Sequence, residues 1–133
     1  MYYALDSNIV IHLMIGTQVV RKKRDEVIKA DARLFIPPVV DYEIRRGLLI
    51  KPSKNRKKAY DAITKMCILE NMSTEAWFRA AQIYAALYAK RFTVKDADIL
   101  VAAFSITKDC ILVTDNTKDF INIDGLNLTN WNE

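Results

Sequence analysis

The chain has 133 residues, of which 51% are hydrophobic and 27% charged, and its 20 Lys and Arg against 16 Asp and Glu give a net charge of +4. This length suits one domain, residues 1–133, with a core that needs neither disulfides nor a structural metal. The apolar runs are far shorter than the roughly 20 residues that cross a bilayer, and no secretion signal is present, so we expect a cytoplasmic protein without a membrane segment.

In chain order, the first half alternates short apolar strands with helices. The first strand, over 2–6, ends in a carboxylate, and Ser7 with Asn8 is expected to cap the helix that follows. The Pro37-Pro38 pair stops the second strand and favours the start of a helix. We expect strands over 2–6, 33–36 and 67–69, and helices over 9–15, 18–29, 39–49 and 55–66.

The second half continues the alternation. We expect an alanine-rich helix over 74–90, a loop over 93–96, a helix over 97–107, a strand over 111–114 with a turn after it, and an edge strand over 126–128. Strands that alternate with helices indicate a parallel sheet covered on both faces. The expected fold class is therefore α/β: a three-layer α/β/α sandwich around a central, mainly parallel sheet of about five short strands.

Charge is divided unevenly along the chain. Residues 1–66 carry a net charge of +7, whereas residues 67–133 carry −3. Basic side chains cluster over 21–24 and 51–58, with Arg45 and Arg46 between them. Such clusters are either solvated helix faces or a surface that binds phosphates of a polyanion.

Residue types exclude several common catalytic sites. No Cys/His cluster has the spacing of zinc ligands, and the 3 glycines are isolated, so no glycine-rich phosphate loop exists. His12, the only histidine, lies in an apolar run and is interpreted as an ordinary helix residue. Any chemistry must then depend on carboxylates.

Four acidic residues lie where a parallel sheet places its ligands. Asp6 and Asp115 follow the first and fourth strands, and open α/β sheets bind ligands outside the carboxyl ends of their strands. Glu43 and Asp98 lie on apolar helix faces, where an unpaired carboxylate costs several kcal/mol. A divalent cation would satisfy all four. The alternatives are helix caps for Asp6 and Asp98, a solvated Glu43 and a turn residue at Asp115.

Four segments carry a resemblance to a known family: LDSNIVI at 5–11, VDYEIRRG at 40–47, DADILVAA at 96–103 and LVTDNTKDF at 112–120. In this order and spacing the chain resembles the PIN domain, in particular the VapC toxins of VapBC toxin–antitoxin pairs, from about Tyr3 to Trp131. The resemblance implies an α/β/α fold and an endoribonuclease that depends on Mg²⁺, with Mn²⁺ as the alternative.

The resemblance also implies roles for individual residues. Asp6, Glu43 and Asp98 match the first three family acids and are expected to hold the metal. The fourth catalytic position falls on Asn116, and Asp115 beside it is the alternative. Three polar neighbours are expected to orient the carboxylates or a metal-bound water, namely Ser7, Asn8 and Thr114.

Partners follow from the same resemblance. VapC-like proteins form homodimers and are neutralised by a cognate VapB antitoxin, whose C-terminal segment lies in a groove and blocks the site. The expected substrate is a structured RNA such as tRNA. From the charge distribution, we expect Arg45 and Arg46 to contact its backbone together with one of two basic clusters, either residues 22–24 or residues 54–58 with Lys57 and Lys58.

Two other functions fit the sequence less well. One is a Mg²⁺-dependent phosphoryl-transfer domain with a phosphorylated strand-end Asp, but no second acid lies two residues after Asp6 and no Lys ends the strand over 111–114. The other is a catalytically inert PIN-like binding module. Metal-dependent cleavage of RNA by the pure protein separates it from the enzyme.

Overall fold

A computed structural model describes all residues, 1–133, and places five strands in one sheet. The strand order is β3-β2-β1-β4-β5, and every neighbouring pair is parallel. Strand β1 (Tyr2–Leu5) lies in the centre, between β2 (Arg33–Ile36) and β4 (Ile111–Val113), while β3 (Ile68–Leu69) and β5 (Asn127–Thr129) form the edges.

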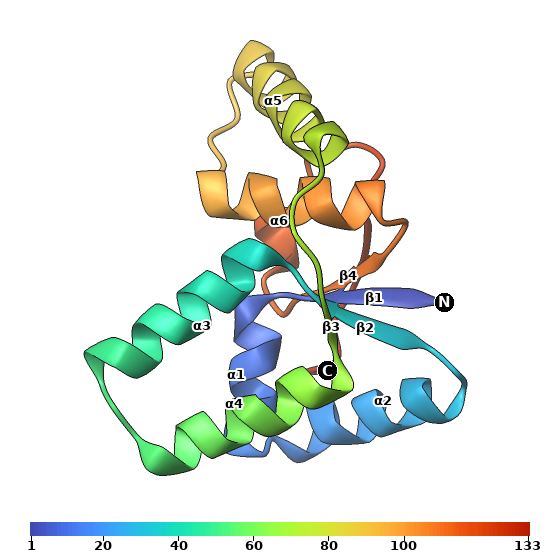
Figure 1. Cartoon of the computed structure of the whole chain (residues 1–133). Helices are drawn as coiled ribbons and strands as arrows, with labels where there is room; N and C mark the ends of the chain where they lie inside the picture. Colours follow the sequence, from blue (N-terminus) through green and yellow to red (C-terminus); the bar gives the residue numbers. More distant parts are fainter.

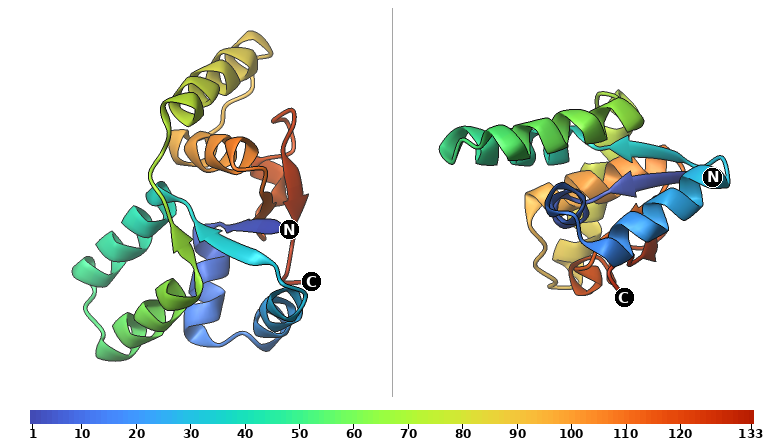
Figure 2. Two further views of the ribbon diagram at one scale, coloured as in Figure 1. Left: turned by 45° about the vertical axis from the view of Figure 1, so that its right-hand side comes forward. Right: turned by 90° about the horizontal axis from the view of Figure 1, so that it is seen from below.

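Six α-helices cover this sheet. Figure 1 shows α5 and α6 on one side of the strands, α1, α2 and α4 on the other, and α3 beside the end of the sheet. Figure 2 shows the same layers from two further directions. The α/β/α sandwich with a parallel sheet is thereby confirmed. The helix bounds are α1 (Ser7–Ile15), α2 (Gln18–Lys29), α3 (Pro38–Ile50), α4 (Lys54–Met66), α5 (Thr74–Ala89) and α6 (Asp96–Thr107).

The central strand is buried on both faces, as a parallel strand between two helical layers must be. Ala4 of β1 lies beside Phe35 of β2 and Leu112 of β4, and all three side chains belong to one hydrophobic core. Helix α6 is the most deeply buried helix, because residues 101–105 are all buried between the sheet and α5. None of the helices has both the length and the apolar character that crossing a membrane requires.

The strand order creates a switch point next to β1. The chain passes from β1 outward to β2 and β3, and then returns to the other side of β1 to form β4 and β5. At such a point the connections leave the sheet in opposite directions and open a crevice beyond the carboxyl ends of the strands. The carboxyl ends of β1 and β4 therefore face the place where a ligand is expected.

Most elements differ by one or two residues in their boundaries from the sequence-based predictions, and two of these differences bear on the site. Asp6, and not Ser7 or Asn8, is the N-cap of α1, since its backbone is extended and its side chain accepts the N–H of Ser7 at 2.9 Å. Helix α6 begins at Asp96, one residue earlier than expected. The turn after β4 continues into a short 3₁₀-helix, η1 (Thr117–Asp119).

Candidate active site

Asp6 lies at the end of β1 and is held by three hydrogen-bond donors. Its side chain is buried, and its Oδ1 accepts the N–H of Ser7 at 2.9 Å. Its Oδ2 accepts the Thr114 hydroxyl at 2.8 Å and the Asn8 amide at 3.2 Å. Burial raises the pKa of Asp6, while these donors act in the opposite direction. The side chains of Asn8 and Thr114 thus orient the Asp6 carboxylate, whereas Ser7 contributes only its backbone N–H.

Glu43 and Asp98 approach Asp6 from two helices. Glu43 lies in the second turn of α3 and Asp98 in the first turn of α6, and both are half-buried. Burial raises the pKa of Glu43, and the charge of Asp6 raises it further. Burial likewise raises the pKa of Asp98 to about 6, with the charges of Asp6 and Asp119 adding to the effect. Three segments far apart in sequence therefore bring carboxylates close enough to repel one another.

Asp119 is a fourth member of this cluster. The sequence-based prediction had placed the fourth position on Asn116 or Asp115 instead. It lies at the end of η1, where its carboxylate accepts a hydrogen bond from the Asn116 side-chain amide. Its charge raises the pKa of Asp98. The sequence feature that could have indicated Asp119 is its spacing of three residues from Asn116, because one turn of a 3₁₀-helix brings two such residues together.

Asp115 has a different partner. Its Oδ2 lies 3.0 Å from Nε2 of His12, and its backbone N–H donates to Oδ1 of Asn8 at 3.2 Å. Its charge raises the pKa of Asp6 but is no cause of the raised pKa of Glu43 or Asp98. Asp115 therefore acts on Asp6 alone and stands apart from Glu43 and Asp98. His12 lies in α1, as expected, and its ring also has polar side chains beside both nitrogens.

Two cations lie near the cluster, which the apolar helix faces did not predict. Nη2 of Arg46 is 3.8 Å from Oε2 of Glu43. Lys95, immediately before α6, lowers the pKa of both Glu43 and Asp98. Four carboxylates against two cations leave an excess of negative charge, which a divalent cation would neutralise.

The donor set fits a hard cation that keeps part of its water. No three His, Cys, Asp or Glu side chains converge closely enough to hold one ion directly. Mg²⁺, however, commonly binds through one or two carboxylates and several waters. Oδ1 of Asp6 accepts one hydrogen bond and so retains a lone pair for a metal. Asp6 and Asp98 are the carboxylates that such an ion would use, with Glu43 and Asp119 beside them.

The basic side chains expected to contact RNA fall into two groups. Nε of Arg45 bonds both oxygens of Asp41, at 2.9 and 3.0 Å, and its guanidinium lies over the Tyr60 ring. These contacts fix the orientation of Arg45, whose side chain remains 58% exposed. Lys57 and Lys58 are exposed on α4 and form no ion pair. Among the side chains expected to contact RNA, the two lysines of α4 are thus without an ion pair.

An apolar groove begins at the carboxylate cluster. It lies between α1 and α3 and has a cavity volume of about 150 Å³. Glu43 marks its acidic part, whereas Lys51 and Arg56 supply positive charge. Its apolar lining comes from Ile11, Met14, Ile15, Ile44 and Leu48.

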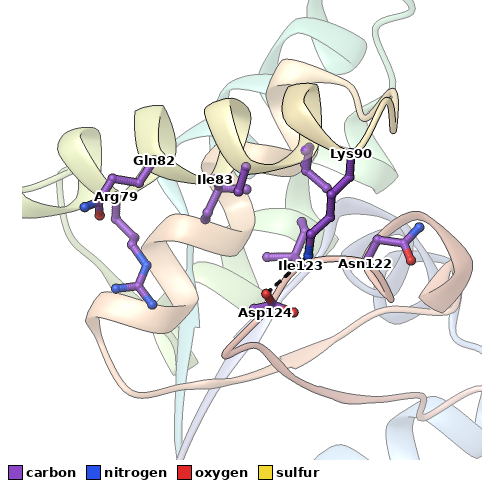
Figure 3. Close-up of a pocket in the computed structure, with 9 residues that line it drawn as sticks. Arg79, Gln82, Ile83, Lys90, Asn122, Ile123 and Asp124 are labelled. Atoms are coloured by element: carbon purple, nitrogen blue, oxygen red, sulfur yellow. Dashed lines mark ion pairs between the residues drawn. The ribbon is translucent and has the colours of Figure 1, made fainter.

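A second groove lies apart from the cluster. Figure 3 shows it between α5 and the segment that precedes β5, with Arg79 toward one end and the Lys90–Asp124 ion pair, 3.6 Å long, toward the other. None of the clustered carboxylates lines it. The chemistry of the carboxylates is therefore confined to the crevice beside β1 and β4.

Comparisons with known proteins agree with this geometry. Residues 3–126 match the family described as PIN domain. The curated protein Ribonuclease VapC2 from Rickettsia felis is 25% identical over 135 residues, and the match covers 100% of both chains.

Solved structures share the fold. The crystal structure of VapBC2 from Rickettsia felis bound to a promoter DNA fragment superimposes with a TM-score of 0.90 at 23% identity, covering 98% of this chain and 99% of that one. VapBC-1 from nontypeable Haemophilus influenzae gives a TM-score of 0.88 at 20% identity, covering 100% of both chains.

Proposed function

The chain belongs to the PIN domain family, and we propose that it is a metal-dependent endoribonuclease, the toxin of a VapBC-type toxin–antitoxin pair. The observation that carries the proposal is the meeting of Asp6, Glu43 and Asp98 at one end of the sheet. Burial raises the pKa of all three, and the charge of Asp6 raises the pKa of the other two further. The likeness to Ribonuclease VapC2 supports RNA as the substrate.

We assign the metal to Asp6 and Asp98, with Mg²⁺ as the expected ion and Mn²⁺ as a substitute. When bound, such an ion lowers the pKa of a coordinated water and offsets charge on a phosphodiester. Thr114 and Asn8 keep the Asp6 carboxylate in one orientation through hydrogen bonds of 2.8 and 3.2 Å. Glu43, whose pKa is raised, is suited to accept a proton from the attacking water.

The direct test is the exchange of each proposed ligand for its amide. Asp6→Asn and Asp98→Asn should each abolish cleavage of a structured RNA that the wild-type protein cuts with Mg²⁺ and leaves intact with EDTA. Asp96→Asn is the matched control, because Asp96 is exposed in the same turn of α6 and perturbs none of the clustered carboxylates. Full cleavage by Asp6→Asn or Asp98→Asn would overturn the assignment.

We propose that RNA reaches this site over the basic surface of α4. Lys57 and Lys58 have no internal partner, unlike Arg45, so their ammonium groups are free to bind phosphates. The substrate is proposed to be a structured RNA such as tRNA. Deep sequencing of RNA ends after induced expression would identify it.

We further propose that a VapB-like antitoxin segment occupies the apolar groove beside Glu43, and that the toxin forms a homodimer. Solved structures with this fold include VapBC complexes. Ile15 lines the groove and is 61% exposed, so Ile15→Glu can be made without disturbing the core. This variant should keep its cleavage activity and escape inhibition by the antitoxin. Light scattering of the free toxin tests the homodimer.

A catalytically inert PIN-like binding module is the second candidate. It is favoured by the lack of three carboxylates that converge directly on one point. A pure protein that binds RNA and cuts none in Mg²⁺ or Mn²⁺ would establish it. Trapping of a phospho-aspartate would instead identify a phosphoryl-transfer domain.

A further inference from the structure

His12 has polar side chains beside both ring nitrogens, and Thr17 and Asp115 are its hydrogen-bond partners. It lies in α1, and its Nδ1 is 2.9 Å from the hydroxyl of Thr17. Its Nε2 is 3.0 Å from Oδ2 of Asp115, and the side-chain amide of Asn132 lies 3.2 Å from the same nitrogen. An imidazole with polar neighbours at both nitrogens has a fixed ring orientation.

The contact with Asp115 also sets the protonation of the ring. A carboxylate oxygen only accepts hydrogen bonds, so the 3.0 Å contact requires a proton on Nε2 of His12. The Thr17 hydroxyl satisfies Nδ1, because a hydroxyl either donates to a bare ring nitrogen or accepts from a protonated one. His12 is therefore a donor aimed at Asp115.

A continuous series of hydrogen bonds leads from Asp115 to Asp6. The backbone N–H of Asp115 donates to Oδ1 of Asn8 at 3.2 Å. The amide of Asn8 donates in turn to Oδ2 of Asp6, and also to the hydroxyl of Thr114, both at 3.2 Å. Thr114 completes the series, since its hydroxyl donates to the same oxygen of Asp6 at 2.8 Å. Fixing Asp115 thus fixes both side-chain donors of Asp6.

We propose that His12 is a positioning residue for the metal site, which holds the turn after β4 through Asp115 and so keeps Asp6 ready to bind a cation. This inference rests on the proposed function. Without His12, the Asp115 carboxylate has no side-chain donor, and the turn after β4 loses its side-chain contact with α1. Outer residues of this kind change metal affinity by about 10- to 100-fold.

The test measures metal binding separately from cleavage. Mn²⁺ binding is followed by the EPR signal of the free ion, without RNA, for wild type and for His12→Ala, His12→Gln, Asp115→Ala and the His12→Ala/Asp115→Ala double variant. We expect about 10-fold weaker Mn²⁺ binding for His12→Ala, with a lower kcat for cleavage and an unchanged KM for RNA. His12→Gln should recover most of the affinity, because its amide offers a donor to Asp115. The double variant should bind Mn²⁺ no more weakly than either single variant.

Tyr60→Phe is the control for a general loss of stability. Its hydroxyl bonds Asp41 between α3 and α4, away from this series of contacts. The inference is overturned if His12→Ala binds Mn²⁺ as wild type does, if the two single effects add in the double variant, or if Tyr60→Phe weakens Mn²⁺ binding equally. A wild-type protein that neither binds Mn²⁺ nor cuts RNA contradicts the proposed function itself.

Discussion

Asp98→Asn should stabilise the metal-free protein at neutral pH. Folding raises the pKa of Asp98 from 3.8 to about 6, so the folded chain binds more protons than the unfolded chain between these values. The free energy of unfolding must then fall as the pH rises through this window. Above pH 6 the carboxylate is charged, which costs free energy because it is partly buried and because Asp6 and Asp119 repel it, whereas asparagine avoids both costs.

The magnitude follows from the shift. Two pKa units correspond to about 3 kcal/mol, at 1.36 kcal/mol per unit. Asp98 is only half-buried, so solvent screening reduces the expected gain to about 1–2 kcal/mol. For a chain of 133 residues, this gain raises Tm by about 4–7 °C.

Thermal and urea unfolding in EDTA at pH 4 and at pH 7.5 check this expectation. The two proteins should be equally stable at pH 4, and Asp98→Asn should be the more stable at pH 7.5. Asp96→Asn changes an exposed residue in the same turn of α6 and should be as stable as wild type at both pH values. Added Mg²⁺ should stabilise wild type more than Asp98→Asn. If Asp98→Asn is less stable than wild type at pH 7.5 in EDTA, the carboxylates do not repel one another as described.

Three further predictions concern other parts of the molecule. Asp119→Asn should lower the pKa of Asp98, because a repelling charge is lost; NMR titration of the Asp98 carboxyl in EDTA would show this, and an unmoved pKa contradicts it. Lys57→Glu/Lys58→Glu should weaken RNA binding and reduce the slope of log K against log salt by about 1 for each lost phosphate contact; an unaltered slope would identify a merely solvated face. Tyr60→Phe should lower the free energy of unfolding by about 1–2 kcal/mol in urea titrations, since it leaves Asp41 without its 2.6 Å hydrogen bond; unchanged stability would mean that this bond contributes nothing.

The fold and the first three acids were predictable because their signals are local. Alternating strands and helices specify a covered parallel sheet. Asp6 ends a buried strand, and Glu43 and Asp98 lie on apolar helix faces, so each stands out in its own segment. The expected edge strand over 126–128 was found one residue later, as Asn127–Thr129.

The remaining features depend on contacts that sequence spacing does not reveal. His12 and Asp115 are 103 residues apart, and nothing near either residue indicates the other. Asp119 is exposed, and only the turn of η1 brings it back to the cluster. Arg45 lies in a basic stretch, yet Asp41 one turn earlier binds it on the same helix. A basic stretch alone does not reveal such a pairing within the helix.

The position of β1 in the centre of the sheet decides when, during synthesis, the catalytic crevice can form. Asp6 is made among the first residues, but its hydroxyl donor Thr114 follows 108 positions later. Until β4 has left the ribosome, one edge of β1 has no partner for its backbone groups, and η1 with Asp119 does not exist. The complete set of carboxylates therefore comes together only when most of the chain has been made.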